Sequence, residues 1–363
     1  IDTSGNKSEL NAAISVTPKL VDDDIFAEIR DKTLHIKTNA QMQQWIDSLN
    51  DVTSPSEPTF THITNYNTVK IYDTVVDYTI TRGIALSCAD SFSIIGVGKP
   101  KLKISMGNAS NKLYIKSTSF FMDNMSFEFL TTTGAAFYLK PYRVASEFVS
   151  YNLDIKNSYF KGKTAISLTS DNLNNVILGN INNCIFENSN IFFYNQYYAS
   201  TININNNVFK NTGTVIVAGN LIDFIDISGS WSSCIISKNS FENCGIEFPS
   251  SFVTRQLKIS ENNFNINYPT PLISSVTNSI IYIYSDPITI QGYIINNNFR
   301  VNISSATFSN SINVIYAEYD FIYGQVSNNS FYSDNPTKAI FNSWINIATG
   351  ISTGTIIANN TNN

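Results

Sequence analysis

The sequence predicts an all-β fold, a parallel β-helix closed at its N-terminal end by a short helix. Three observations predict it: a repeat along the chain, a five-residue spacing inside the repeat, and a composition that favours strands. The repeat is an aliphatic residue, several polar residues rich in Asn, and a Phe five places after the aliphatic residue. Clear copies occur at Ile155…Phe160, Ile181…Phe186, Ile204…Phe209, Ile236…Phe241, Ile259…Phe264, Ile294…Phe299 and Val326…Phe331, with a weaker copy at Met122…Phe127 and one lacking Phe at Ile357…Asn362.

The period and the internal spacing of the repeat favour a β-helix. Successive Phe positions lie 23 to 35 residues apart, an interval that is typical of solenoids. Two inward residues on one strand are separated by an even number, so a spacing of five requires a turn between Ile204 and Phe209. Asn206 lies at this turn, and Asn readily adopts the left-handed conformation of a sharp corner. Asn side chains stacked from coil to coil can also hydrogen-bond to one another.

The composition limits the classes of fold and partner. The chain has 363 residues, of which 43% are hydrophobic and only 14% are charged. A solenoid of this length needs no second core, because it grows in one dimension. The net charge of −5 gives no reason to expect nucleic acid as a partner, and no Lys/Arg cluster indicates an anionic membrane surface. No apolar run is long enough to insert into a membrane.

The elements before the repeats can be assigned in order. Thr38 and Gln41 form a capping box, and Met42, Trp45 and Ile46 have helical spacing, so Asn39–Leu49 is expected to be an amphipathic helix that covers the open end of the solenoid. We expect residues 1–52 to be the lead-in and capping helix. Residues 53–363 then form the β-helix, without a C-terminal domain. Its first strands are predicted at Val69–Tyr72, Tyr78–Ile80, Ile84–Leu86, Phe92–Ile95 and Leu102–Ile104.

The capping helix, the strand series and the I-x-x-N-x-F repeats resemble the pectate-lyase-like superfamily of right-handed parallel β-helices. Within it the chain is most similar to bacteriophage tailspikes, the capsular polysaccharide depolymerases. The resemblance covers roughly residues 39–363 and concerns the fold more than the chemistry. It implies a right-handed coil, a homotrimer, and bacterial surface polysaccharide (capsule or lipopolysaccharide) as the partner. It also implies a location in a virion tail or at an extracellular surface.

The position after each repeat Phe forms a column of alternating charge. Because neighbouring coils stack ~4.8 Å apart, these residues are expected to form cross-strand ion pairs that fix the register on a solvated face. We place no catalysis there. The column reads Glu128, Lys161, Glu187, Lys210, Glu242, Asn265, Arg300 and Tyr332.

A second outward face combines carboxylates with aromatic rings. Strict alternation along Ile281–Asp286 and Ile315–Asp320 turns the aliphatic residues inward and the Tyr, Asp and Glu residues outward. Counting back from each Phe aligns Asp226 with Tyr194, Tyr284 and Tyr316, and it aligns Asp286 with Glu318. Sugar rings stack on aromatic side chains, and glycosidic cleavage usually needs two carboxyl groups. The predicted sugar-binding residues are Tyr194, Tyr197, Tyr198, Tyr284 and Tyr316.

The candidate acids form three groupings. Asp286 and Glu318 are expected in adjacent coils, where a shared proton would raise one pKa. Asp226 and Asp286 would lie two coils apart, roughly 10 Å, near the upper limit for an inverting pair. Asp223 and Asp226 on one strand, with Glu247 in the next coil, form a tighter cluster. The predicted catalytic residues are Asp226, Asp286, Glu318, Asp320, Asp223 and Glu247.

These residues predict a polysaccharide depolymerase, most simply a glycoside hydrolase without cofactor or metal. Three alternatives stay open: a polysaccharide lyase with Arg255, Lys258 or Arg300 as base, a non-catalytic glycan-binding adhesin, and a purely structural solenoid. His35 and His62 both precede the repeats, so a histidine base in the groove is not expected. The four cysteines show no metal-ligand spacing, and only Cys234 and Cys244 are close enough in sequence for a disulfide to be considered.

Overall fold

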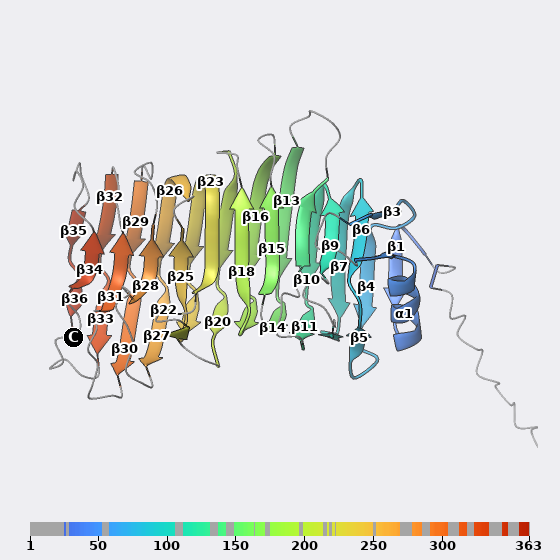
Figure 1. Ribbon diagram of the computed structural model, residues 1–363, viewed down its shortest axis with the longest axis horizontal. Coiled ribbons are helices and arrows are strands. Elements are labelled where there is room, and N and C mark those ends of the chain that lie inside the picture. Colours follow the sequence, from blue (N-terminus) through green and yellow to red (C-terminus); the bar gives the residue numbers. More distant parts are fainter. Residues whose placement is uncertain are drawn as a thin grey trace, which may run out of the picture.

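The computed structural model shows a row of stacked coils built almost entirely from parallel β-strands, and the one helix among the described residues lies at one end (Figure 1). This arrangement is an all-β solenoid and fits the predicted parallel β-helix. Each complete coil contributes one strand to each of three sheets, which we call the first, second and third sheets. The structure describes residues 25–26, 29–52, 58–105, 112–130, 137–142, 149–162, 164–170, 175–195, 199–212, 216–217, 220–221, 223–249, 252–268, 278–284, 291–303, 312–317, 323–333, 343–347 and 356–362.

The first sheet carries the outward carboxylates and tyrosines. Its strands pair in parallel from coil to coil. A short strand, β2 (Asn50–Asp51), pairs with it in antiparallel fashion. The strands are β3 (Thr61–Ile63), β6 (Ile84–Cys88), β9 (Leu113–Ser117), β12 (Phe137–Pro141), β15 (Thr164–Ser170), β18 (Asn190–Asn195), the first half of β23 (Asp223–Ser237), β25 (Gly245–Phe248), β28 (Asn278–Ile283), β31 (Ile312–Ala317) and β34 (Ser343–Ile347).

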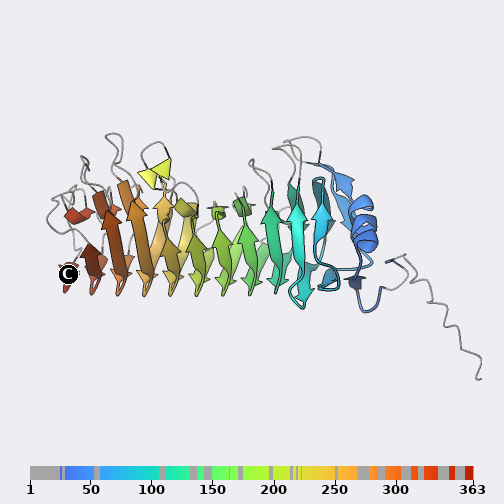
Figure 2. The same ribbon diagram turned by 90° about the horizontal axis from the view of Figure 1, so that it is seen from below.

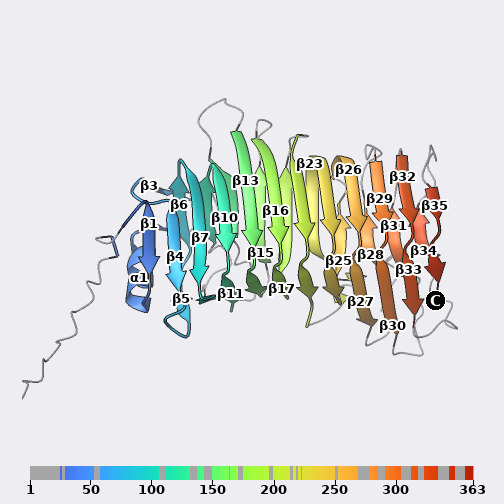
Figure 3. The same cartoon turned by 180° about the vertical axis from the view of Figure 1, so that it is seen from behind.

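The second sheet is the face seen in Figure 3, and it follows the first sheet along the chain. The strand β23 runs through both sheets and bends at Gly229, which has a φ of 81°. The second-sheet strands are β1 (Thr33–Ile36), β4 (Thr68–Tyr72), β7 (Ser91–Val97), β10 (Ser119–Asp123), β13 (Val149–Lys156), β16 (Asn175–Asn182), β19 (Thr201–Asn205), the second half of β23, β26 (Val253–Ser260), β29 (Gln291–Ile295), β32 (Tyr323–Ser327) and β35 (Ile356–Ala358).

The third sheet holds the repeat Phe residues and is reached by a sharp corner after each second-sheet strand. A hairpin of β21 (Ile216–Val217) and β22 (Asn220–Leu221) stands out from the row of coils (Figure 2). The third-sheet strands are β5 (Tyr78–Ile80), β8 (Lys101–Ile104), β11 (Ser126–Phe129), β14 (Tyr159–Lys161), β17 (Ile185–Glu187), β20 (Val208–Lys210), β24 (Ser240–Glu242), β27 (Asn263–Tyr268), β30 (Asn298–Ile303), β33 (Ser330–Ser333) and β36 (Thr361–Asn362).

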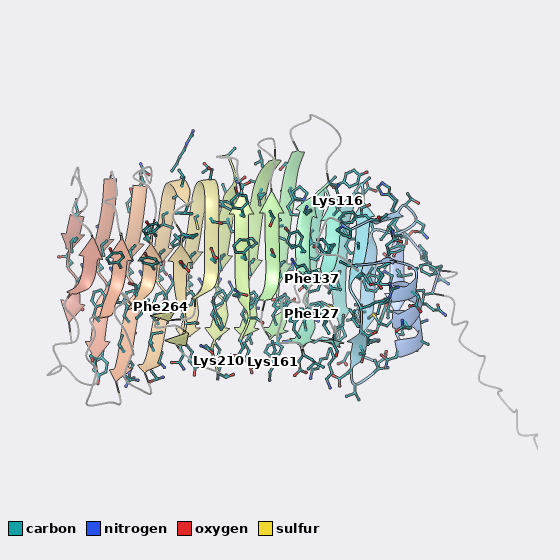
Figure 4. The ribbon with its side chains drawn as sticks, in the orientation of Figure 1. Lys116, Phe127, Phe137, Lys161, Lys210 and Phe264 are labelled. Atoms are coloured by element: carbon teal, nitrogen blue, oxygen red, sulfur yellow. The ribbon has the colours of Figure 1, made fainter. Side chains whose placement is uncertain are left out.

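The predicted interior columns are confirmed. Every aliphatic repeat residue is the register partner of its counterpart in the next coil, from Met122 to Ile357. The eight repeat Phe rings from Phe127 to Phe331 stack with centroids 4.6–5.5 Å apart and planes within 11°. Figure 4 shows two of them, Phe127 and Phe264, in place along the coils.

The corner between the second and third sheets uses two adjacent positions. The residue three before each Phe, such as Asn206, has a positive φ of 52–58° in every copy, as the sequence predicts. The residue two before Phe is a buried Asn in the later coils. We call Asn207, Asn239, Asn262, Asn297 and Asn329, together with the half-buried Asn360 that ends the series, the buried Asn ladder.

In this ladder the side-chain oxygen of each later Asn accepts a bond from the backbone N–H of the Asn one coil earlier, at 2.9–3.0 Å. Its side-chain nitrogen donates to a backbone carbonyl at the end of a second-sheet strand, at 2.8–3.0 Å. The ladder satisfies the backbone groups that the corner would otherwise bury without partners.

The capping helix α1 (Asn39–Asp47) ends two residues before the predicted limit, at the C-cap Ser48. Thr38 Oγ1 accepts the N–H of Gln41 at 3.1 Å, and Gln41 Oε1 accepts the N–H of Lys37 at 2.8 Å, which are the bonds of a capping arrangement. Trp45 is buried, donates to Tyr66, and lines an apolar cavity together with the first coils. The strand β1 precedes α1 and already pairs with β4, so the coils begin before the helix.

We predict that Asn262→Ala lowers the free energy of unfolding by ~3–5 kcal/mol. The substitution leaves the N–H of Asn239 and the carbonyl of Ile236 buried without partners, and each such group costs about 1–3 kcal/mol. Urea denaturation measures the change. The control is Asn203→Ala, which removes an exposed Asn–Asn bond and is expected to cost less than ~0.5 kcal/mol. Equal losses for the two variants would contradict a structural role for the ladder.

Candidate active site

The outer face of the first sheet carries one continuous column of outward residues, which we call the first-sheet column. Register pairing joins each member to the next one along the coils. The side chains in this column change from aromatic to acidic and back to aromatic. In order, they are Tyr114, Tyr138, Ser167, Phe192, Asp226, Glu247, Tyr282 and Tyr316.

Asp226 and Glu247 form the acidic centre of this column. They are register partners on β23 and β25, so their backbones lie one strand spacing apart, ~4.8 Å. Asp226 Oδ1 is buried and has no hydrogen-bond partner among the described residues. Burial, and then the negative charge of Glu247, raise the pKa of Asp226 to about 6. The pair therefore combines one carboxyl that keeps its proton up to about pH 6 with a second carboxyl group beside it.

The tyrosines follow one coil beyond the acids. Tyr282 and Tyr316 are stacked with centroids 5.5 Å apart, and Tyr284 lies 6.1 Å from Tyr282. Tyr284 is 37% exposed, while the aliphatic neighbours Ile281 and Ile283 are buried. We call Tyr282, Tyr284 and Tyr316 the tyrosine shelf. This shelf places partly exposed tyrosine rings directly beside Glu247, the register partner of Tyr282.

The predicted alignment of Asp226 with Tyr194 and Tyr284 is wrong, whereas Tyr316 shares the register column of Asp226 as predicted. Asp226 is the register partner of Phe192, whereas Tyr194 pairs with Ser228, two residues further along the strand. Tyr316 pairs with Tyr282 and not with Tyr284. Counting back from each Phe crosses the connection between the first and second sheets. That connection varies in length, since β23 passes through without a break while residues 284–290 separate β28 from β29.

The structure describes some of the other predicted site residues and leaves others outside the described ranges. The cluster of Asp226 and Glu247 in adjacent coils is present. Asp223 lies on the same strand and its backbone pairs with Gly245, with a register shift before Ile225, but its side chain is outside the described part of the structure. Outside the described residues altogether lie Asp286, Glu318, Asp320, Tyr197 and Tyr198.

The charge column on the third sheet has the predicted register throughout, from Glu128 to Tyr332. Lys161 pairs with Glu187 at 3.2 Å and Lys210 with Glu242 at 3.5 Å. A hydrogen bond from Tyr159, and then one from Lys161, lower the pKa of Glu187. Figure 4 shows Lys161 and Lys210 side by side along one long edge. The acids of this column are thus neutralised by lysines, unlike Asp226.

Sequence reasoning did not assign Tyr282 a binding role, nor Phe192, Tyr114 and Tyr138 a place in the column. A signal was present for two of them, because Leu113–Lys116 and Phe137–Lys140 share the pattern apolar-Tyr-aliphatic-Lys. An offset of thirteen residues from Phe127 reaches Tyr114, but Tyr138 lies 22 residues before Phe160, so counting from Phe does not align the two. The four cysteines are buried, and no disulfide joins Cys234 to Cys244.

Within the described ranges, no group of three or more His, Cys, Asp or Glu residues is placed to hold a metal ion. None of the described residues forms a helix long and apolar enough to cross a membrane. The fold and the site together define an all-β solenoid whose first sheet carries paired carboxylates beside an aromatic shelf. No protein-family model, no curated protein and no solved structure matches this chain.

We predict that Asp226→Asn stabilises the protein at pH 7.5 but not at pH 4. A carboxyl whose folded pKa is above its unfolded value loses stability as pH rises through this range, and Asn cannot ionise. A shift to about 6 corresponds to ~3 kcal/mol at full effect, and partial exposure to solvent reduces this to ~1–2 kcal/mol. Denaturant unfolding at both pH values measures it.

Glu242→Gln is the matched control, because Glu242 faces a lysine. Its neutralisation is expected to leave stability unchanged or slightly lower at pH 7.5. Equal changes in stability for the two variants would contradict the conclusion that the ionised Asp226 side chain destabilises the fold.

Proposed function

We propose that this chain is a glycoside hydrolase that cleaves a polysaccharide along the outer face of the first sheet. The observation that carries the proposal is the Asp226–Glu247 pair, in which one carboxyl has a pKa of about 6 beside a second carboxylate. Two carboxyl groups in different protonation states are what an acid and a nucleophile require. The tyrosine shelf adds ring faces on which sugars stack.

In the proposed mechanism, Asp226 is the general acid and Glu247 is the nucleophile. The carboxyl groups of retaining glycosidases lie about 5–5.5 Å apart, which suits residues on adjacent coils better than the wider spacing of inverting enzymes. Glu247 attacks the anomeric carbon while Asp226 gives its proton to the departing glycosidic oxygen. Water then hydrolyses the glycosyl ester of Glu247, and Asp226 takes the proton from that water. The anomeric configuration is retained.

The wider proposal follows the resemblance to tailspikes. The fold is a right-handed parallel β-helix, the substrate is a bacterial capsule or lipopolysaccharide, and the active form is a homotrimer in a virion tail or at an extracellular surface. The support for it is the I-x-x-N-x-F repeat, the capping helix and the aromatic surface. Asp286, Glu318 and Asp320 follow the first-sheet strands β28 and β31 in sequence, and we propose them as further acids of the same face.

The experiment is incubation with a panel of purified bacterial capsules and lipopolysaccharides, read by mass spectrometry. We expect fragments that carry one additional water per cleaved bond. Asp226→Asn and Glu247→Gln are each expected to lower the rate roughly 10²–10⁴-fold, and Glu242→Gln is expected to leave it unchanged. Because Asp226 must be protonated, the rate should fall as pH rises above about 6.

Other outcomes would replace the proposal. Fragments with an unsaturated sugar and no added water would identify a polysaccharide lyase and remove the acid–nucleophile assignment. Binding to a glycan with no cleavage at any pH would identify a non-catalytic adhesin, which the exposed tyrosine shelf could serve without the acids.

A further inference from the structure

A second group of side chains lies on the first sheet, near the capping helix. It combines lysines with aromatic rings from β9, β12 and the segments next to them. We call it the basic-aromatic cluster. Its members are Phe60, Lys112, Tyr114, Lys116, Tyr138, Lys140 and Tyr142.

The cluster is held together by ring and ammonium contacts. The rings of Tyr114 and Tyr138 lie 4.8 Å apart, and Phe60 meets Tyr114 edge-on at 6.4 Å. Lys112 Nζ lies 4.7 Å from the centre of the Tyr138 ring, and Lys116 Nζ lies 5.5 Å from that of Phe60. The lysines are therefore aligned along ring faces at a partly exposed surface.

The charge pattern of the cluster differs from that of the third sheet. Lys116 and Lys140 are register partners in adjacent coils, and like charges in directly opposite positions are destabilising. Within the described part of the chain, neither Lys112 nor Lys116 has a carboxylate partner. Burial without such a partner lowers the pKa of Lys112. An anion placed beside Lys112 and Lys116 would offset the loss of hydration of the Lys112 ammonium group.

The cluster and the acid pair share the first-sheet column. Tyr138, Ser167, Phe192 and Asp226 are consecutive register partners, so the rings of the cluster lie three coils, roughly 14 Å, from Asp226. A short run of sugar units can span this distance along the surface. Figure 4 shows Lys116 on the opposite long edge from Lys161 and Lys210, so it belongs to a different face from the charge column.

We propose that the basic-aromatic cluster binds the acidic sugar units of an anionic glycan, whose chain runs along the first-sheet column to Asp226 and Glu247. This inference rests on the proposed function and adds its substrate class, a polysaccharide that bears carboxylates. Tyr138 and Tyr142, which are partly exposed while Tyr114 is buried, stack on sugar rings. Lys112 and Lys116 pair with the carboxylates. A nucleic acid fits less well, because its continuous phosphates would meet the acid pair and a chain of net charge −5.

The test compares each acidic capsule of a panel with its carboxyl-reduced form, in which the uronic acids have become neutral sugars. Binding is measured by calorimetry on the full chain at low and high salt. We expect at least one acidic capsule to bind, and its reduced form to bind at least ~10-fold more weakly. Salt is expected to weaken only the acidic form, since it screens exposed charges.

The variant Lys112→Gln/Lys116→Gln is expected to weaken binding of the acidic capsule at least ~10-fold and to leave binding of the reduced form unchanged. Lys70→Gln is the matched control, because Lys70 also lies on a strand with an aromatic register partner, His35, but in the second sheet. Thermal melting confirms that each variant is folded. The single substitutions Lys112→Gln and Lys116→Gln supply the test if the double variant does not fold.

Three results would overturn the proposal: no acidic capsule binds, native and reduced capsules bind equally, or the lysine variants bind like the unaltered protein. Binding of a single-stranded oligonucleotide as tight as that of the capsule, and lost in the same variants, would replace the glycan with a nucleic acid. The proposed hydrolase is tested separately. Cleavage that needs Asp226 but not Lys112 and Lys116 would reject this inference alone, and lysine-dependent binding without cleavage would reject the hydrolase alone.

Discussion

The corner between the second and third sheets is the constraint on which the rest of the structure depends. A left-handed residue such as Asn206 turns the chain, and a buried Asn such as Asn207 satisfies the backbone groups of that turn. Because the corner has the same length in each repeat, the aliphatic residue before it and the Phe after it fall in register coil after coil. The Phe stack and the charge column follow from this corner. The parallel pairing of strands within the second sheet and within the third sheet follows from it too.

The interior and the charge column could be predicted from the sequence for the same reason. Each lies within a few residues of the corner, so a fixed offset from Phe reaches the equivalent position in every coil. The first sheet lies beyond a connection of varying length, and an offset from Phe there selects different positions, as the pairing of Tyr316 with Tyr282 shows. Asp226 and Glu247 were grouped correctly, since that grouping used strand neighbours and not the offset. Among the described tyrosines aligned by the offset, Tyr316 shares the column of Asp226, and Tyr194 and Tyr284 do not.

The basic-aromatic cluster illustrates a different limit of sequence reasoning. Lys112 and Lys116 lie on one strand and Lys140 on the next, so no basic run is visible in the sequence. The stacking of coils brings them together, because residues about one coil apart become neighbours ~4.8 Å away. In a solenoid, the residues of one surface site therefore come from several coils and are separated in the sequence. The Tyr-aliphatic-Lys pattern, which occurs in both strands, is the sequence feature that indicates this cluster.

Charged residues are arranged differently on the outer faces of the third and first sheets. On the third sheet, acids and lysines alternate and lower the electrostatic energy of the fold, as the lowered pKa of Glu187 reflects. On the first sheet, lysines gather near the capping helix and acids gather three coils away. Burial lowers the pKa of Lys112, and burial together with the charge of Glu247 raises the pKa of Asp226. This separation of lysines from acids creates an electrostatic field along the first-sheet column. A glycan with charged groups would be drawn to one end and oriented, with its neutral linkage units left beside the acid pair.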